Sequence, residues 1–278
     1  MNPRIAVIQM VSGERFEDNL DAAARLVGQA ASEGAKLVLL PENFALFDSA
    51  NLRTLAERGD EVRGRVAELA MQAGVWLVAG SLPLAERTDG TPVAVPRVRA
   101  GCLVFDDAGV ERARYDKRHL FDVDVADAQR SYRESDYVEA GESPVVVDTP
   151  VGCLGLSICY DLRFPQHYQA LRDAGAELIS VPSAFTAVTG AAHWELLLRA
   201  RAVETQCYLL GADQGGRHSN RRETWGHSMV VDPWGDVLGV QATGEGVVIA
   251  ELDRERLREV RAKMPVQAHR EKAAQQSK

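Results

Sequence analysis

The 278-residue sequence has few of the residues and motifs that hold metals, nucleotides or disulfide frameworks. Its four cysteines are scattered without a Cys-x-x-Cys pair, its six histidines are dispersed, and no His-Glu-x-x-His segment occurs. A disulfide scaffold and a zinc site are therefore not expected. The phosphate-binding loop and the Gly-x-Gly-x-x-Gly fingerprint are also missing, which removes the strongest signals for a nucleotide. We expect no metal and no cofactor.

Long apolar runs and a basic excess are absent as well. No stretch approaches the roughly 18 apolar residues of a membrane span, and residues 1–10 lack a credible secretion signal. Lys and Arg number 32 against 40 Asp and Glu, so the net charge is −8. An acidic balance disfavours nucleic acid and anionic membranes as partners. We expect a cytoplasmic protein with reduced thiols.

Short runs rich in Val, Ile and Leu predict mostly buried strands. They cover residues 4–10, 36–40, 75–80, 100–105, 145–147, 152–158, 177–182, 207–212, 228–232 and 247–252. Residues 16–32, 60–73 and 191–206 have the spacing of amphipathic helices. Strand–helix repeats followed by successive strands favour an α/β fold, with a mixed sheet or two sheets packed against outer helices.

No linker interrupts this pattern. The proline-rich segment 83–96 predicts a surface turn between strands and not a domain boundary. We expect a single domain over residues 1–270. Residues 271–278 carry almost no apolar side chain to bury, which predicts a frayed polar tail.

Three strand-like segments lead into a polar residue of a kind that catalysis uses. Residues 36–41 lead to Glu42, residues 152–158 lead to Cys159, and residues 110–115 lead to Asp116 and Lys117. In α/β proteins, sites gather beyond the carboxyl ends of strands, so these residues can meet. A thiol attacks as the thiolate, for which a glutamate can accept the proton and a lysine can stabilise the negative charge.

Each of these residues also has a purely structural interpretation. A cysteine that ends an apolar run is usually a core residue, a glutamate after a proline can cap a loop, and Lys117 lies in a stretch typical of solvated surface. His119 and His193 show no local signature of a Cys–His pair. Spacing alone leaves the function open. The remaining cysteines, Cys102, Cys153 and Cys207, lie within strand-like runs and are expected in the core.

Taken together, three segments resemble the Glu, Lys and Cys boxes of the nitrilase superfamily of carbon–nitrogen hydrolases, in that family's order. They are Leu39-Leu-Pro-Glu-Asn, Tyr115-Asp-Lys-Arg-His-Leu-Phe-Asp-Val-Asp and Ser157-Ile-Cys-Tyr-Asp-Leu-Arg-Phe-Pro. The resemblance extends from about residue 4 to about residue 270. It implies a four-layer α-β-β-α sandwich, and it implies a homodimer or higher homo-oligomer.

The resemblance also implies a role for each matching residue. Glu42 matches the family's general base, Lys117 its transition-state lysine and Cys159 its nucleophile. Glu134 matches a second glutamate that holds the lysine and the substrate amide. The backbone N–H of Tyr160 matches the other oxyanion donor.

The residues around the cysteine indicate a branch of the family. True nitrilases usually follow the cysteine with Trp-Glu, whereas this sequence is similar to the amidase branch with its omega-amidases and deaminated glutathione amidases. The segments that begin at Ala184 and Gly215 resemble the second group more. The resemblance therefore implies a small-molecule substrate whose primary amide is hydrolysed to acid and ammonia, with deaminated glutathione as first candidate. Omega-amidase activity on 2-oxoglutaramate and a non-catalytic interaction module are the alternatives.

Such substrates carry carboxylates, which need cationic or hydrogen-bonding partners. We expect these partners among Arg163, Thr186 and Thr189, and we expect Phe185 to bind the substrate as well. For Arg163, a structural ion pair with Asp161 or another carboxylate is an equally open interpretation.

Overall fold

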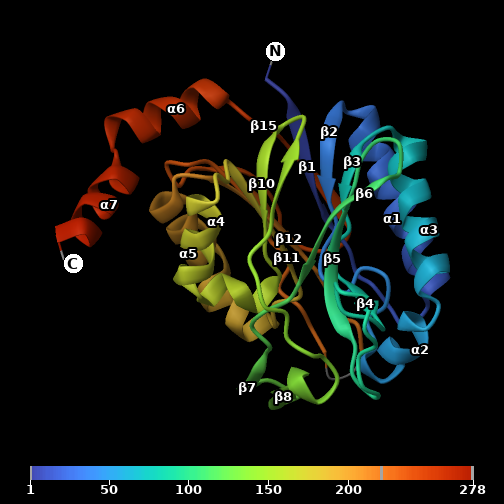
Figure 1. Cartoon of the computed structure of the whole chain (residues 1–278). Helices are drawn as coiled ribbons and strands as arrows, with labels where there is room; N and C mark the ends of the chain where they lie inside the picture. Colours follow the sequence, from blue (N-terminus) through green and yellow to red (C-terminus); the bar gives the residue numbers. More distant parts are fainter. Residues whose placement is uncertain (1, 220–221, 277–278) are drawn as a thin grey trace.

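Two β-sheets pack face to face in the computed structural model, which describes residues 2–219 and 222–276 (Figure 1). The first, seven-stranded sheet has the order β15 (Gly246–Glu251), β1 (Arg4–Gln9), β2 (Ala35–Leu39), β3 (Trp76–Val78), β5 (Arg99–Phe105) and β4 (Leu82–Leu84), with β6 (Glu111–Asp116) paired to β5. The second, six-stranded sheet has the order β14 (Val237–Gln241), β13 (Ser228–Val231), β12 (Tyr208–Asp213), β11 (Leu178–Ser183), β10 (Gly152–Leu156) and β9 (Val146–Thr149).

Helices cover the outer face of each sheet (Figure 1). The first sheet is covered by α1 (Phe16–Ser32) and α3 (Gly59–Ala73), and the second by α4 (Pro165–Asp173) and α5 (Ala187–Thr205). This arrangement confirms the four-layer α-β-β-α sandwich. Within the described ranges, no helix is both long enough and apolar enough to cross a membrane.

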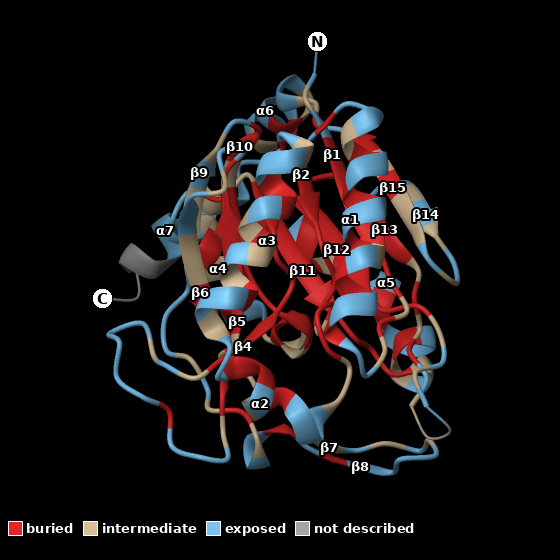
Figure 2. Ribbon diagram, turned by 90° about the vertical axis from the view of Figure 1, so that its right-hand side faces the viewer, coloured by how far each residue is buried: buried red, intermediate tan, exposed pale blue. Residues whose placement is uncertain are grey.

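The central strands, such as β1, β11 and β12, are buried on both faces, which explains their continuous apolar runs. In β1, Ile5 and Val7 face the core between the two sheets, whereas Ala6 and Ile8 pack with the layer of α1 and α3. Figure 2 shows the same division, with buried strands inside and helices exposed on their outer surfaces.

Every predicted strand and all three predicted helices are present, with small differences at their ends. The missed helices are α2 (Leu52–Ala56), α4, α6 (Arg254–Lys263) and α7 (Val266–Gln276). They are short or mostly polar; α6 buries only Leu257 and Val260, so it has no wide apolar stripe to detect. The polar tail predicted from residue 271 is instead helical up to Gln276, as the end of α7. Residues 277–278 of that prediction lie outside the described residues.

The direction of the strands brings the predicted site residues to one end of the sandwich. β1, β2 and β3 are parallel, and β6 has the same direction because it is antiparallel to β5, which is antiparallel to β3. β10, β11 and β12 are parallel in the other sheet. The loops after β2, β6, β10 and β11 carry Glu42, Lys117, Cys159 and Phe185.

A glycine in the first sheet allows the loop of Glu42 to take its position. Gly80, between β3 and β4, has a φ of 38°, and a Cβ at this residue would lie 1.9 Å from the carbonyl oxygen of Pro41. Pro41 immediately precedes Glu42, so a side chain at position 80 would push the glutamate loop away.

We therefore expect Gly80→Ala to destabilise the protein by about 2–4 kcal/mol, because a left-handed backbone and an overpacked contact both oppose the methyl group. Chemical denaturation measures this loss. Gly64→Ala is the matched control: Gly64 lies in α3 with no atom within 4 Å of the added carbon, so the free energy of unfolding should increase by about 0.5–1 kcal/mol. Equal effects of the two substitutions would contradict the packing argument.

Candidate active site

The loop after β2 is held by polar contacts on both sides of Glu42. The backbone carbonyl of Glu42 accepts a hydrogen bond from Gln214 Nε2 at 3.0 Å, and the next backbone N–H, of Asn43, donates to Ser81 Oγ at 2.9 Å. Gln214 follows β12 of the second sheet, so this contact joins the two sheets at their carboxyl ends. The Glu42 side chain is buried.

Lys117 follows β6 and places its ammonium between two buried glutamates. Its Nζ lies 2.7 Å from Glu42 Oε1, and 2.8 Å and 2.9 Å from the two carboxylate oxygens of Glu134. Glu134 begins a short 3₁₀ turn after β8 (Ser131–Arg133), and it also accepts a hydrogen bond from the backbone N–H of Phe121. An ammonium has three N–H donors, which match these three oxygens, so a further acceptor can be bound only by releasing one of the two Glu134 contacts.

Cys159 begins a 3₁₀ turn (Cys159–Arg163) shortly after the end of β10. Its φ is 47°, a left-handed conformation that is uncommon for a residue with a side chain and is often associated with functional turns. The thiol is buried beside Glu42 and Lys117, whose charges both act on it. The structure thus brings the sulfur, the carboxylates and the ammonium into one site.

Asp161 joins the cysteine turn to the segment that carries Lys117. Its buried carboxylate accepts hydrogen bonds from the Ile158 backbone N–H at 2.8 Å and from the Tyr115 hydroxyl at 2.7 Å. It also accepts from the backbone N–H and the Nδ1 of His119 at 3.1 Å and 2.7 Å. Tyr115 and His119 each lie two residues from Lys117, so the contacts of Asp161 fix the position of the Cys159 turn relative to Lys117.

Charge and burial set the resting protonation of the site. Burial opposes the positive charge of Lys117, but Glu134 and Glu42 outweigh it and raise the pKa of this ammonium well above its ordinary value. Burial and then the charge of Glu42 raise the pKa of the Cys159 thiol well above its ordinary value, against the opposing effect of Lys117. Burial also raises the pKa of Glu134. Cys159 is therefore a neutral thiol that must lose its proton to react.

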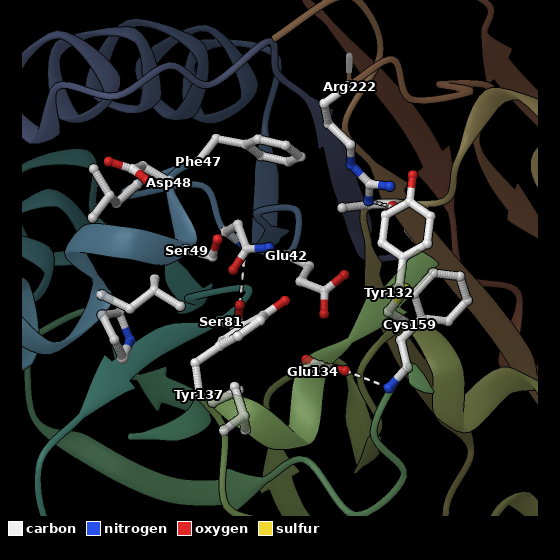
Figure 3. Close-up of a pocket in the computed structure, with 18 of the residues that line it drawn as sticks. Glu42, Phe47, Asp48, Ser49, Ser81, Tyr132, Glu134, Tyr137, Cys159 and Arg222 are labelled. Atoms are coloured by element: carbon white, nitrogen blue, oxygen red, sulfur yellow. Dashed lines mark hydrogen bonds between the residues drawn. The ribbon is translucent and has the colours of Figure 1, made fainter. Parts of the chain in front are cut away.

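These residues open into a cavity of about 270 Å³ (Figure 3). Of the residues predicted to bind substrate, Arg163, Phe185 and Thr189 line the cavity, as does Tyr160. Thr186 is not brought to it: this residue caps α5 and its hydroxyl accepts from the Thr189 backbone N–H.

The structure also tests the ion-pair interpretation of Arg163. Asp161 is occupied by the contacts described above, and Arg163 forms no ion pair with a described carboxylate. Its Nη1 lies 3.2 Å from His193 Nδ1, and its guanidinium lies over the rings of Tyr160 and Phe185.

Sequence reasoning missed several residues of the cavity wall, among them Phe47, Tyr132, His218 and Arg222. Arg222 lies in a charged, polar stretch that follows no apolar run, so no local pattern distinguishes it from solvated surface. Among the remaining cysteines, Cys102 and Cys207 are buried as expected, but Cys153 is only partly buried. In the part of the chain that the structure describes, no group of three His, Cys, Asp or Glu residues is arranged to hold a metal ion.

A family model described as carbon–nitrogen hydrolase matches residues 4–262. The chain belongs to the carbon–nitrogen hydrolase family. It is 45% identical over 271 residues to a protein of Yersinia enterocolitica named deaminated glutathione amidase, covering 96% of this chain and 93% of the relative.

Solved structures of this family have the same fold. The NitFhit protein of C. elegans is 40% identical with a TM-score of 0.85, covering 97% of this chain and 66% of that chain. An amidase from Nesterenkonia sp. AN1 is 28% identical with a TM-score of 0.78, covering 94% of this chain and 98% of that chain. The description of that amidase reports addition of acrylamide at its active-site cysteine. The family predicted from the three boxes is confirmed, and the chain is an amidase-type hydrolase.

Replacing Glu42 separates two effects of its carboxylate in this hydrolase. In Glu42→Gln, we expect the pKa of Cys159 to decrease because a negative charge beside the thiol is lost while Lys117 remains. Turnover should nevertheless fall by about 10²–10⁴-fold, the loss typical of a missing general base, which is the role that the family resemblance implies for Glu42. Ultraviolet absorbance of the thiolate against pH measures the first effect, with Cys159→Ser as the blank. An unchanged or increased pKa would contradict this account.

Proposed function

We propose that this hydrolase cleaves an amide of a small carboxylated molecule through a Cys159 thioester, with deaminated glutathione as its substrate. The observation that carries the proposal is the buried Lys117 ammonium held between Glu42 and Glu134 beside a cysteine in a left-handed turn. A folding scaffold has no need of this arrangement, since burying three charges is costly. The name of the Yersinia relative supports the choice of substrate.

In the first half-reaction, Glu42 accepts the proton of Cys159 and the sulfur attacks the amide carbonyl carbon. The negative charge that forms on the carbonyl oxygen is stabilised by an N–H of Lys117, which exchanges one Glu134 oxygen for this contact, and by the backbone N–H of Tyr160. Glu134 keeps the ammonium in place. The tetrahedral intermediate then loses its amine, which takes the proton from Glu42, and leaves a thioester on Cys159.

In the second half-reaction, Glu42 removes a proton from water, which attacks the thioester at the same carbonyl carbon. The same two donors hold the oxyanion. Collapse releases the acid and returns the proton to Cys159. The sum is one amide plus one water giving one acid plus one amine, with the enzyme restored.

The chemistry of the substrate corrects one expectation. Deaminated glutathione contains two secondary amides and no primary amide, so cleavage beside its oxo-acid chain releases a dipeptide amine instead of ammonia. Ammonia is the product only for the alternative substrate 2-oxoglutaramate. Arg163, Phe185 and Thr189 remain the candidates for binding the oxo-acid portion.

A comparison of these two substrates tests the proposal. We expect the higher kcat/KM with deaminated glutathione, measured by the appearance of a new primary amine. A higher kcat/KM for ammonia release from 2-oxoglutaramate would favour the omega-amidase alternative, and no turnover of either would overturn the proposal.

The role of Lys117 has its own test. In Lys117→Met, we expect turnover to fall by about 10²–10³-fold or more, because an oxyanion donor is lost. Lys36→Met is the control, since Lys36 is exposed on β2, and it should retain full turnover. Near-normal turnover by a folded Lys117→Met protein would remove this lysine from the mechanism.

We further propose that the enzyme is a cytoplasmic homo-oligomer that associates through α5. Leu196 and Val203 on this helix are 66% and 49% exposed, and Trp234 beside it is 50% exposed. Arg199 of α5 bonds the carbonyl of Gly235, which places the tryptophan turn against the helix. Adjoining exposed apolar side chains are typical of a protein interface.

Leu196→Glu should raise the dissociation constant of the oligomer by about 30-fold or more, because a charge replaces an interface side chain. Light scattering over a range of concentrations measures this change. Met71→Glu is the control: Met71 is 52% exposed, but on α3 at the opposite side of the sandwich (Figure 1). Equal association of the two variants would contradict the proposed interface.

A further inference from the structure

The cavity wall contains a guanidinium that the mechanism does not use. Arg222 lines the cavity from a loop of the second half of the chain, and Figure 3 shows its side chain beside Tyr132. The guanidinium carbon lies 4.9 Å from the Tyr132 ring centre and 5.7 Å from that of Phe47. Aromatic contacts leave the N–H edges of a guanidinium as the part that binds anions.

The hydrogen bonds of Arg222 are incomplete. Nη2 donates to the Ala184 carbonyl at 2.8 Å. Nη1 is shielded from solvent and has no hydrogen-bond partner among the described residues. A buried donor without an acceptor is costly, so an acceptor supplied by a ligand would stabilise this group.

The charge of Arg222 is also uncompensated. It forms no ion pair within the part of the chain that the structure describes. The nearby Asp213 forms no ion pair with Arg222, and burial raises the pKa of this carboxyl well above its ordinary value, which disfavours its charged form. Arg222 thus differs from Lys117, whose charge is matched by two glutamates.

The surroundings of Arg222 are rigidly built. His218 stacks on Phe47 with ring centres 3.7 Å apart. Its Nδ1 lies 2.7 Å from the Ser12 carbonyl oxygen and its Nε2 lies 2.7 Å from Thr224 Oγ1. Burial lowers the pKa of His218 to about 4, so this imidazole is neutral, and it packs against the Phe47 ring without adding a charge. Tyr132 is held through its hydroxyl, which donates to Asp127 at 2.6 Å.

We propose that Arg222 binds a carboxylate on the leaving-group side of the substrate. The proposal rests on the proposed function, under which Arg163 is the cationic candidate for the oxo-acid carboxylate. Arg163 packs on Tyr160 and Phe185, whereas Arg222 packs on Phe47 and Tyr132, so the two guanidiniums form separate anion sites. Together they make the cavity selective for amides with a carboxylate on each side of the scissile bond. In deaminated glutathione, the second carboxylate is the C-terminus of the departing dipeptide.

Three substrates separate this role from a structural one: deaminated glutathione, its C-terminal amide, and 2-oxoglutaramate, which has no carboxylate on its leaving group. In Arg222→Met, we expect kcat/KM for deaminated glutathione to fall by about 10–100-fold, the loss of a charge-assisted hydrogen bond. The other two substrates should change by less than about 3-fold, since the contact is absent for them. In Arg163→Met, kcat/KM should fall for all three substrates, since all three carry the oxo-acid carboxylate.

A comparison within the wild-type protein does not depend on any variant. Amidation of the C-terminal carboxylate should lower kcat/KM by a factor similar to that of Arg222→Met. For deaminated glutathione, the kcat/KM of Arg222→Lys should lie between those of the wild type and Arg222→Met, because an ammonium keeps the charge without the paired donors. Equal losses for all three substrates, or no loss for deaminated glutathione, would overturn the role of Arg222 and leave the proposed function intact. No wild-type turnover of any of the three would overturn both.

Discussion

The buried ammonium of Lys117 is the interaction on which the rest of the site depends. It joins Glu42 after β2 to Glu134 after β8, and it lies beside Cys159 after β10. A charge removed from water is tolerated only when it is closely paired, so the three loops are constrained to one arrangement. The same pairing keeps the lysine charged, and in the proposed mechanism it holds the ammonium where the substrate oxygen develops charge. The pairing of Lys117 with the two glutamates therefore offsets the cost of burying the ammonium and, under the proposed function, also positions it for catalysis.

The two sheets provide the frame for this pairing. Glu42 and Lys117 belong to the first sheet, whereas Cys159 belongs to the second, so their distance depends on how the sheets pack. Asp161 and Gln214 join the sheets by hydrogen bonds at the end where the site lies. Burial and the charge of Glu42 raise the pKa of the Cys159 thiol, so the thiolate that reacts is disfavoured in the resting site.

Charges in the cavity are divided by position. The centre of the site combines two glutamates with one lysine. The wall adds two cations, Arg163 and Arg222, neither of which is paired with a described carboxylate, and two acidic residues, Glu14 and Asp48. Under the proposed function, the carboxylates of the substrate would meet Arg163 and Arg222 on the wall, and Glu42 would accept the proton of the sulfur. Under this proposal, the loops that hold Phe47, Tyr132 and Arg222 determine which amides bind, whereas the residues after β2, β6 and β10 carry out the hydrolysis. Substitutions in those loops can then change the substrate without changing the hydrolytic reaction.

The sequence by itself determined the central buried strands, the three long helices and the four polar side chains that meet at the site, whereas β4 and β14 were not predicted. Strands buried on both faces appear as continuous apolar runs, and the three boxes are contiguous stretches that can be read without knowing the fold. Short or charged helices such as α4 and α6 lack that signal because they bury little. Only the tertiary structure placed Thr186 in a helix cap, tied Asp161 to His119 and brought Arg222 between Phe47 and Tyr132. These contacts join residues far apart in the chain, and their energies arise from burial and pairing that exist only after the sheets have packed.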